Sequence, residues 1–305
     1  MRIAILGAES LGVRGLSCVV EVGDHKVVID PGLALGYQRH GLLPHPAQVA
    51  VGEQVRRRIL SALEDATDVV LSHFHGDHVP LPDANPYQLK AQRVAPLCRT
   101  TRFWARGLTG LSHNMLHRRE SLCRVLGRDL PNAEGKKDGP LAFSLPVPHG
   151  RPGSRLGMVM MTRIEGDGTV FVHASDIQLL NGEAVSRILA WHPDVVLAGG
   201  PPLYLSWLSP KRREVAWGNA LRLARDVDTL ILDHHLLRSE EGVSWLVRLS
   251  SETGHAVICA ADFMDRPRCL LEARREQLYR EMPVPKGWHA AYARGEADTR
   301  RYRED

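Results

Sequence analysis

The sequence predicts a layered α/β protein in which helices cover β-sheets. Short apolar and β-branched runs gather within residues 1–35, and from about residue 141 similar runs alternate with segments of helical periodicity. Histidine and aspartate residues recur directly after several of these runs, where α/β proteins place ligand-binding groups. The 305 residues can bury a sizeable core, so we expect one large domain.

Composition and charge exclude several classes of protein. Hydrophobic residues make up 44% and charged residues 24% of the chain, as in ordinary globular proteins. No apolar stretch approaches the roughly 18–20 residues that span a bilayer, so we expect a cytoplasmic protein without membrane contact. The net charge of +4 permits an anionic substrate. Five scattered cysteines without a C-x-x-C pair predict neither a disulfide framework nor a zinc ribbon.

Three strands and one helix are expected in the first part of the chain. Residues 3–6, 17–22 and 26–29 have strand character, and a Gly-Asp-His turn joins the last two. The third strand runs into an Asp-Pro-Gly turn, which places Asp30 at a strand end. Residues 51–66 have the spacing of an amphipathic helix.

The next element carries the strongest chemical signal of the chain. An apolar run over residues 67–72 predicts a buried strand, and His73, His75, Asp77 and His78 follow it in the pattern H-x-H-x-D-H. A lone histidine is most often a core or surface residue, but clustered histidines repel one another when protonated. Metal binding uses neutral imidazoles and an ionised carboxylate, so this turn predicts a metal site.

Residues 82–140 lack strand alternation and predict a mostly helical insert with loops. This segment interleaves basic and aromatic residues, including Arg99, Arg102, Phe103 and Trp104. Such a pattern can bind nucleic acid through phosphate contacts and stacking. A helical cap with a solvated basic face is the simpler interpretation.

Strands and helices alternate over the remaining chain. Strands are expected at residues 141–147, 157–164, 169–173, 194–197, 229–232 and 256–260, and helices at residues 183–190, 211–225, 242–253 and 270–281. The last segment, residues 266–305, is highly charged and predicts a C-terminal helix and a polar tail.

Three later strand ends carry residues that could complete the metal site. His149 follows the strand at 141–147, Asp176 follows that at 169–173, and His234 and His235 follow that at 229–232. Each residue alone could cap a turn or lie on the surface, but their repetition at equivalent positions indicates a shared site. His234 is the preferred ligand because it comes first after its strand, and His235 remains an alternative.

The order H-x-H-x-D-H, His, Asp, His resembles the metallo-β-lactamase superfamily of hydrolases, and the Asp-Pro-Gly turn matches its first motif. More narrowly, five segments resemble a subfamily of predicted metal-dependent hydrolases, a description that carries no substrate. These segments are residues 9–14, 147–150, 173–176, 199–202 and 232–238. The resemblance implies an αββα sandwich over residues 1–265, with two metals at one edge of two mixed sheets.

The resemblance also assigns roles to residues. It implies that His73, His75 and His149 hold one metal, that Asp77, His78 and His234 or His235 hold a second, and that Asp176 bridges both. Asp30 would orient a ligand or the turn beneath the site.

Two divalent ions sharing a bridging water would supply a hydroxide that attacks an ester or phosphodiester, and Asp77 could orient this nucleophile. Nitrogen and carboxylate ligands without thiolate favour zinc, while manganese and iron would accept the same set. Arg14 and Arg151 lie close to the site in sequence and could bind an anionic small or medium substrate.

Three other functions stay open from the sequence. One is a nuclease or nucleic-acid phosphodiesterase of the same fold, although the chain has no room for a second domain of about 200 residues. Another is an iron-dependent oxidoreductase acting on a thiol substrate. The third is a non-catalytic binding protein. The sequence does not specify the oligomeric state.

Overall fold

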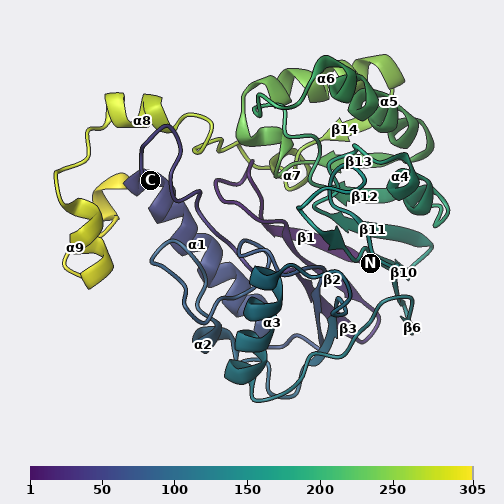
Figure 1. Ribbon diagram of the computed structural model, residues 1–305, viewed down its shortest axis with the longest axis horizontal. Coiled ribbons are helices and arrows are strands. Elements are labelled where there is room, and N and C mark those ends of the chain that lie inside the picture. Colours follow the sequence, from purple (N-terminus) through teal and green to yellow (C-terminus); the bar gives the residue numbers. More distant parts are fainter. Residues whose placement is uncertain (304–305) are drawn as a thin grey trace.

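The computed structural model describes residues 1–303 and confirms the α/β class with αββα layers. Two β-sheets pack face to face, helices cover the outer face of each, and the last helices project beside the first layer (Figure 1). The last two residues of the expected polar tail, 304 and 305, lie outside the described residues. Within residues 1–303, no helix has the length and apolar character needed to cross a membrane.

The first sheet has five strands in chain order. These are β1 (Arg2–Gly7), β2 (Ser17–Val22), β3 (His25–Ile29), β4 (Asp68–Leu71) and β5 (Arg102–Ala105). The first three are antiparallel neighbours, whereas β3, β4 and β5 run parallel. Both faces of this sheet are covered: Val27 and Ile29 pack between the sheets, and Val28 packs against the outer helices.

The second sheet has seven strands in the order β14-β13-β12-β11-β10-β7-β6. Their bounds are β6 (Lys137–Asp138), β7 (Leu141–Phe143), β10 (Thr162–Gly166), β11 (Thr169–Ser175), β12 (Val195–Ala198), β13 (Thr229–Leu232) and β14 (Ala256–Ile258). The strands from β11 to β14 are parallel, so their carboxyl ends share one edge. A separate antiparallel pair, β8 (Val147–Pro148) and β9 (Met158–Val159), forms a small hairpin.

Helices cover the outside of each sheet (Figure 1). The first sheet carries α1 (Pro46–Leu63), α2 (Ala91–Val94) and α3 (His113–Leu126), and the second carries α4 (Gly182–Leu189), α5 (Pro210–Asp226) and α6 (Glu241–Thr253). Helix α1 begins five residues before the expected start because Pro46 occupies its first turn and the His45 side chain accepts a hydrogen bond from the Ala47 amide.

The prediction that residues 82–140 form a mostly helical insert is wrong, because part of this segment is a strand of the first sheet. Strand β5 lies within these residues and pairs with β4, so this segment completes the first sheet. Phe103 is 4% exposed in the core and the Trp104 indole donates to Asp68, which explains these two aromatic residues structurally. Only α3 is a long helix in this segment.

The C-terminal segment continues beyond the single expected helix. After the short α7 (Ala260–Phe263), α8 (Arg275–Glu281) and α9 (Trp288–Arg294) are followed by a 3-10 turn, η2 (Arg300–Tyr302). Trp288 and Tyr302 are buried in the same cluster as the inner face of α1. The polar tail is therefore anchored by two aromatic residues within an otherwise charged sequence.

Candidate metal centre

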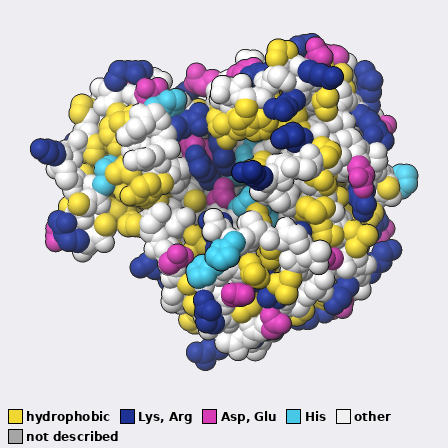
Figure 2. Space-filling view, viewed as in Figure 1, with side chains coloured by type: hydrophobic (Ala, Val, Ile, Leu, Met, Phe, Trp, Pro, Cys, Tyr) yellow, Lys and Arg dark blue, Asp and Glu magenta, His cyan; other side chains and the backbone are white. Residues whose placement is uncertain are grey.

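The site lies where strand ends of the two sheets meet. Asp30 follows β3, the histidine turn follows β4, Asp176 follows β11, and His234 follows β13 by two residues. Figure 2 shows histidine, acidic and basic side chains together in a hollow near the middle of one face. Asp30, the histidine turn, Asp176 and His234 thus lie after strands, as predicted. The expected strand at 141–147 is wrong beyond Phe143, where β7 ends, and His149 instead follows β8 of the separate hairpin.

The backbone is strained at three of these strand ends. Asp30, Ser175 and His234 have φ angles of 47°, 55° and 39°, in the left-handed region that residues with a side chain rarely adopt. Such strain persists where the surrounding structure determines it, and it concentrates at functional sites. Here it turns the chain sharply after each strand.

Two glycines let neighbouring backbone approach the histidine turn. A Cβ atom at Gly32 would lie 2.3 Å from the backbone carbon of His78, and one at Gly15 would lie 2.5 Å from the carbonyl oxygen of Asp77. The Gly15 amide also donates a hydrogen bond to His234 Nδ1 over 3.1 Å. Both glycines are therefore required by close packing around the site.

Asp176 lies at the centre of the candidate ligands, and its two carboxylate oxygens face different sets of them. Its Oδ2 atom lies 3.4–3.8 Å from ring nitrogens of His73, His75, His149 and His235, which we name cluster one. Its Oδ1 atom lies 2.9 Å from His78 Nε2 and 3.4 Å from His234 Nε2. These two histidines and Asp77, whose Oδ2 lies 3.5 Å from His234 Nε2, form cluster two.

The sequence left His234 and His235 as alternatives, and the structure brings both to Asp176. His234 contacts Asp77 and faces Oδ1, whereas His235 Nε2 lies 2.9 Å from His149 Nε2 and faces Oδ2. The two adjacent rings point into different clusters because the chain turns at the strained His234. All eight candidate ligands therefore come together in one site.

The donor atoms fit divalent cations. Nitrogen atoms of His73 and His75 face each other at 2.9 Å, as do those of His149 and His235. His78 Nε2 and Asp176 Oδ1 are buried without a hydrogen-bond partner, despite their short separation. Converging imidazole and carboxylate atoms of this kind match the ligand preferences of zinc and related metals.

Burial keeps most of the imidazoles neutral. Desolvation and the nearby His78 and His75 lower the pKa of His73 to about 4, and burial lowers the pKa of His234 to about 3. Burial opposes ionisation of Asp176 too, but the surrounding histidines hold its pKa well below the ordinary value. Neutral imidazoles and an ionised carboxylate are the states that metal binding requires.

His78 differs because it lies between two carboxylates. Its Nδ1 atom contacts Asp30 Oδ2 at 2.9 Å while Nε2 faces Asp176, so its pKa is raised well above the ordinary value although burial opposes this. Asp30 also accepts hydrogen bonds from the amide and hydroxyl of Ser72. Asp30 thus fixes both the His78 ring and the start of the histidine turn.

Sequence reasoning missed two residues that border the clusters. Arg238 places Nη2 2.8 Å from His234 Nε2 and 3.6 Å from Asp77 Oδ2, and Glu9 holds its guanidinium. Gln178 is 2% exposed, and its Nε2 lies 3.4 Å from His149 Nε2. Arg238 lies within segment 232–238, which carries the family resemblance, although no role was expected for it, and the signal for Gln178 is its position two residues after Asp176.

The two arginines predicted to bind substrate have different surroundings. Arg14 forms a two-pronged ion pair with the buried Glu272, so its charge is already matched within the protein. Arg151 is exposed and has no ion pair among the described residues. Substrate binding by either residue stays a prediction.

Comparisons with known proteins agree with this geometry. Residues 12–79 match the model of the metallo-β-lactamase superfamily. The chain is 50% identical over 302 residues to a UPF0282 protein from Methanosarcina mazei, covering 99% of both chains, and 32% identical to a UPF0282 protein from Pyrococcus abyssi, covering 94% and 97%. The fold is similar to that of Tm1679, described as a metal-dependent hydrolase of the β-lactamase superfamily, with a TM-score of 0.50, 15% identity and coverage of 85% and 94%.

Proposed function

The chain belongs to the UPF0282 family, and because residues 12–79 match the metallo-β-lactamase superfamily, we propose that it is a hydrolase that uses two divalent metal ions. The observation that carries this proposal is the position of Asp176, whose two oxygens face two separate ligand clusters. A single carboxylate in this position can hold two ions close together. A purely structural metal site needs no such arrangement.

Each cluster of residues would hold one metal ion. His73, His75, His149 and His235 would hold one ion, and Asp77, His78 and His234 the other. When bound, the ions would lower the pKa of water and stabilise negative charge that develops on the substrate. The side chains of His75 and Asp77 are 21% and 19% exposed, whereas the other ligands are nearly or fully buried, so the substrate would approach from their side.

Asp77 would orient the attacking water. Burial opposes its ionisation, but His78, His234 and Arg238 lower its pKa, so the carboxylate is charged at neutral pH. The same carboxylate belongs to cluster two, where it would be a metal ligand. We propose zinc as the metal, because thiolates are missing from the donor set and imidazoles dominate it.

The substrate would be a small or medium anionic ester or phosphodiester rather than a nucleic acid. In residues 82–140, Arg106 donates to the carbonyls of Gly107 and Thr109, and Arg118 donates to that of Phe74. Phe103 is buried, so it offers no stacking surface to a base. The basic segment is therefore used largely for internal structure.

Metal analysis and turnover test this proposal together. Protein purified without added metal is analysed for zinc, manganese and iron, then loaded with each and assayed on phosphodiesters, carboxylic esters, lactones and thioesters. We expect two ions per chain and a turnover that a chelator abolishes. Asp176→Asn should lose both ions, whereas Asp226→Asn, at the exposed end of α5, should keep them. Metal-replete protein without turnover on any class would contradict the hydrolase, and iron as the native metal would contradict zinc.

A further inference from the structure

A pocket lined by three arginines lies beside the metal centre. Its lining includes Arg151 and Arg155 from the β8–β9 loop, Trp207 and Arg212 at the start of α5, and the buried Gln178, around a cavity of about 430 Å³. We name this cavity the arginine pocket. Gln178 connects this pocket to the metal centre. Its backbone amide donates to the His149 carbonyl, and its side-chain Nε2 lies close to His149 Nε2.

The arginine pocket carries uncompensated positive charge. Its lining contains no aspartate or glutamate, and within residues 1–303 none of its three arginines forms an ion pair. The Arg212 guanidinium donates to the Trp207 carbonyl and lies over the Trp207 ring at 5.6 Å from its centroid. Three guanidinium groups around one cavity, without an acidic neighbour in its lining, make the pocket electropositive and suited to an anion.

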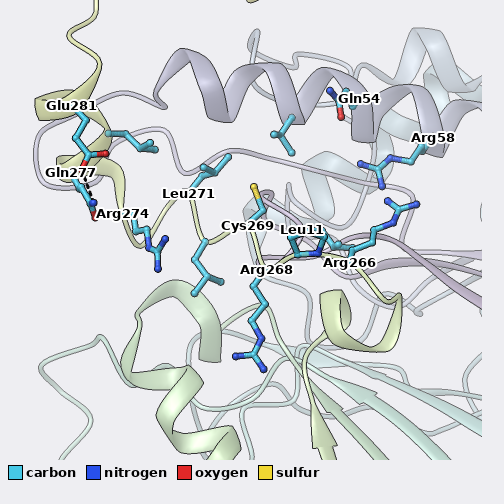
Figure 3. Close-up of a pocket in the computed structure, with 14 residues that line it drawn as sticks. Leu11, Gln54, Arg58, Arg266, Arg268, Cys269, Leu271, Arg274, Gln277 and Glu281 are labelled. Carbon is cyan, nitrogen blue, oxygen red and sulfur yellow. Dashed lines mark hydrogen bonds between the residues drawn. The ribbon is translucent and has the colours of Figure 1, made fainter. Parts of the chain in front are cut away.

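A second pocket is also rich in arginine but has a different charge balance. It lies between α1 and residues 266–281 and has a volume of about 390 Å³ (Figure 3). There, Arg268 pairs with Asp262, Arg274 pairs with Glu240, and Glu281 belongs to the lining, whereas Arg58 and Arg266 form no ion pair among the described residues. No residue of either metal cluster lines that pocket.

Gln178 supplies an independent indication of a ligand. The residue is 2% exposed, and its Oε1 atom is buried without a hydrogen-bond partner. A Cβ atom at Gly150 would lie 2.7 Å from this oxygen, so the glycine leaves room for the amide beneath the loop that carries Arg151. This oxygen accepts hydrogen bonds, so it would contact a donor group of the substrate, such as a hydroxyl, while the arginines would contact its anionic group.

We propose that the arginine pocket binds a phosphate group of the substrate that is separate from the bond being cleaved. The pocket favours phosphate over carboxylate because three guanidinium groups match a doubly charged, multidentate anion better than a singly charged one. This inference rests on the proposed function and narrows it: the substrate is a phosphorylated small molecule whose ester bond reaches the metal clusters.

Binding of inorganic phosphate to the metal-loaded full chain tests the inference without turnover. Titration calorimetry at constant ionic strength should show saturable binding that Arg151→Gln, Arg155→Gln and Arg212→Gln each weaken about tenfold. Arg225→Gln removes an exposed charge from the same helix as Arg212 and should leave the dissociation constant within about twofold. Acetate should bind at least about tenfold more weakly than phosphate.

Two outcomes would overturn the inference. In the first, Asp176→Asn abolishes phosphate binding while the arginine substitutions leave it unchanged. This result would place the anion at the metals alone. The second is acetate binding as tightly as phosphate. If the hydrolase proposal alone is wrong, the result is different. The protein then hydrolyses no substrate with any of the metals, but the Asp176→Asn variant still binds phosphate in the arginine pocket.

Steady-state kinetics with pairs of substrates provide a second test of the arginine pocket. For esters that differ only by a phosphate group, wild-type protein should have the higher kcat/KM for the phosphorylated member, and Arg151→Gln should reduce this ratio about tenfold. An unchanged ratio in Arg151→Gln, with hydrolysis intact, would reject the arginine pocket and leave the hydrolase proposal standing.

Discussion

At the scale of single residues, the centre depends on how two adjacent histidines are divided between two clusters. The φ angle of 39° at His234 turns the chain so that His234 faces Asp77 while His235 faces His149. Had the chain continued as an extended strand, the two side chains would have pointed to opposite faces of the sheet. The strained residue therefore brings two consecutive ligands to one carboxylate.

Substituting each histidine separately tests this division. We expect His235→Ala to weaken binding of one metal ion at least about tenfold while a second ion still binds, and His234→Ala to weaken the other. Calorimetric metal titration with spectroscopy of a cobalt-substituted protein distinguishes the two sites. His192→Ala, at an exposed turn, serves as the matched control. Identical titration curves for His234→Ala and His235→Ala would show that the rings serve a single site.

Part of this site could be predicted from the sequence, because the histidine turn is local and Asp176 and His149 follow recognisable strands. Both His234 and His235 were expected near the metals, but the choice between them depends on one backbone angle. Arg238 and Gln178 could not be predicted, since their contacts with His234 and His149 arise only when separate strand ends meet. Pairing of Arg14 with Glu272, 258 residues away, was equally hidden.

At the scale of elements, buried ion pairs and aromatic anchors attach the C-terminal segment to the body of the protein. Glu272 is 1% exposed and pairs with Arg14 and Arg39. Burial opposes its ionisation, but Arg14, Arg238 and Arg275 lower its pKa from 4.5 to about 2. The ionised carboxylate therefore stabilises the folded state most at neutral pH.

The pH dependence of stability follows from this shift. Since the folded-state pKa is lowered, the contribution of Glu272 is complete above about pH 4.5 and is lost as the pH falls to about 2. We expect Glu272→Gln to reduce the free energy of unfolding at pH 7 by roughly 3 kcal/mol, because it leaves two arginines without their partner. In urea unfolding, the difference from wild type should shrink between pH 4.5 and 2. A difference that is constant with pH would contradict the assigned role of the carboxylate.

The C-terminal segment is also attached to the body of the protein by the buried Trp288, and substitution of this residue tests that attachment. Trp288 is 8% exposed and stacks on Tyr292 with ring centroids 5.0 Å apart. Trp288→Ala should lower the free energy of unfolding by about 3 kcal/mol in urea denaturation, since it removes a large buried side chain. Val247→Ala, at a position 59% exposed on α6, should change it by less than about 0.5 kcal/mol. A similarly small effect of Trp288→Ala would show that α9 contributes little to the fold.

Sequence patterns predicted the apolar strands and the periodic helices better than the mixed segments. Strands β2 and β13 were expected close to their observed bounds because they are apolar runs bounded by turn residues, and α6 because its helical periodicity extends over 13 residues. Strand β5 was missed because Arg102–Ala105 lies in a basic and aromatic segment without strand alternation, and its pairing with β4 determines its conformation. The anchoring of the C-terminal segment was missed because isolated aromatic residues in a charged sequence form no periodic pattern.

At the scale of the whole molecule, the candidate metal centre lies between the two sheets. His73, His75, Asp77 and His78 follow β4 of the first sheet, whereas Asp176, His234 and His235 follow β11 and β13 of the second. The apolar core between the sheets already holds them together, with Ile29 and Val70 packed in one cluster with Phe171 and Ile231. Ions at the centre would add a crosslink at the edge where the strands end.

Metal binding should therefore stabilise the folded protein as well as support turnover. A ligand present at 100 times its dissociation constant adds about 2.7 kcal/mol to the free energy of unfolding, provided that it binds only the folded state. For a chain of this length we expect zinc to raise Tm by about 3–6 °C over chelator-treated protein in thermal denaturation. Asp176→Asn should lose this increment because both clusters share that carboxylate, and Asp226→Asn should retain it. Equal Tm values with zinc and with chelator would mean that the two sheets are held by their core alone.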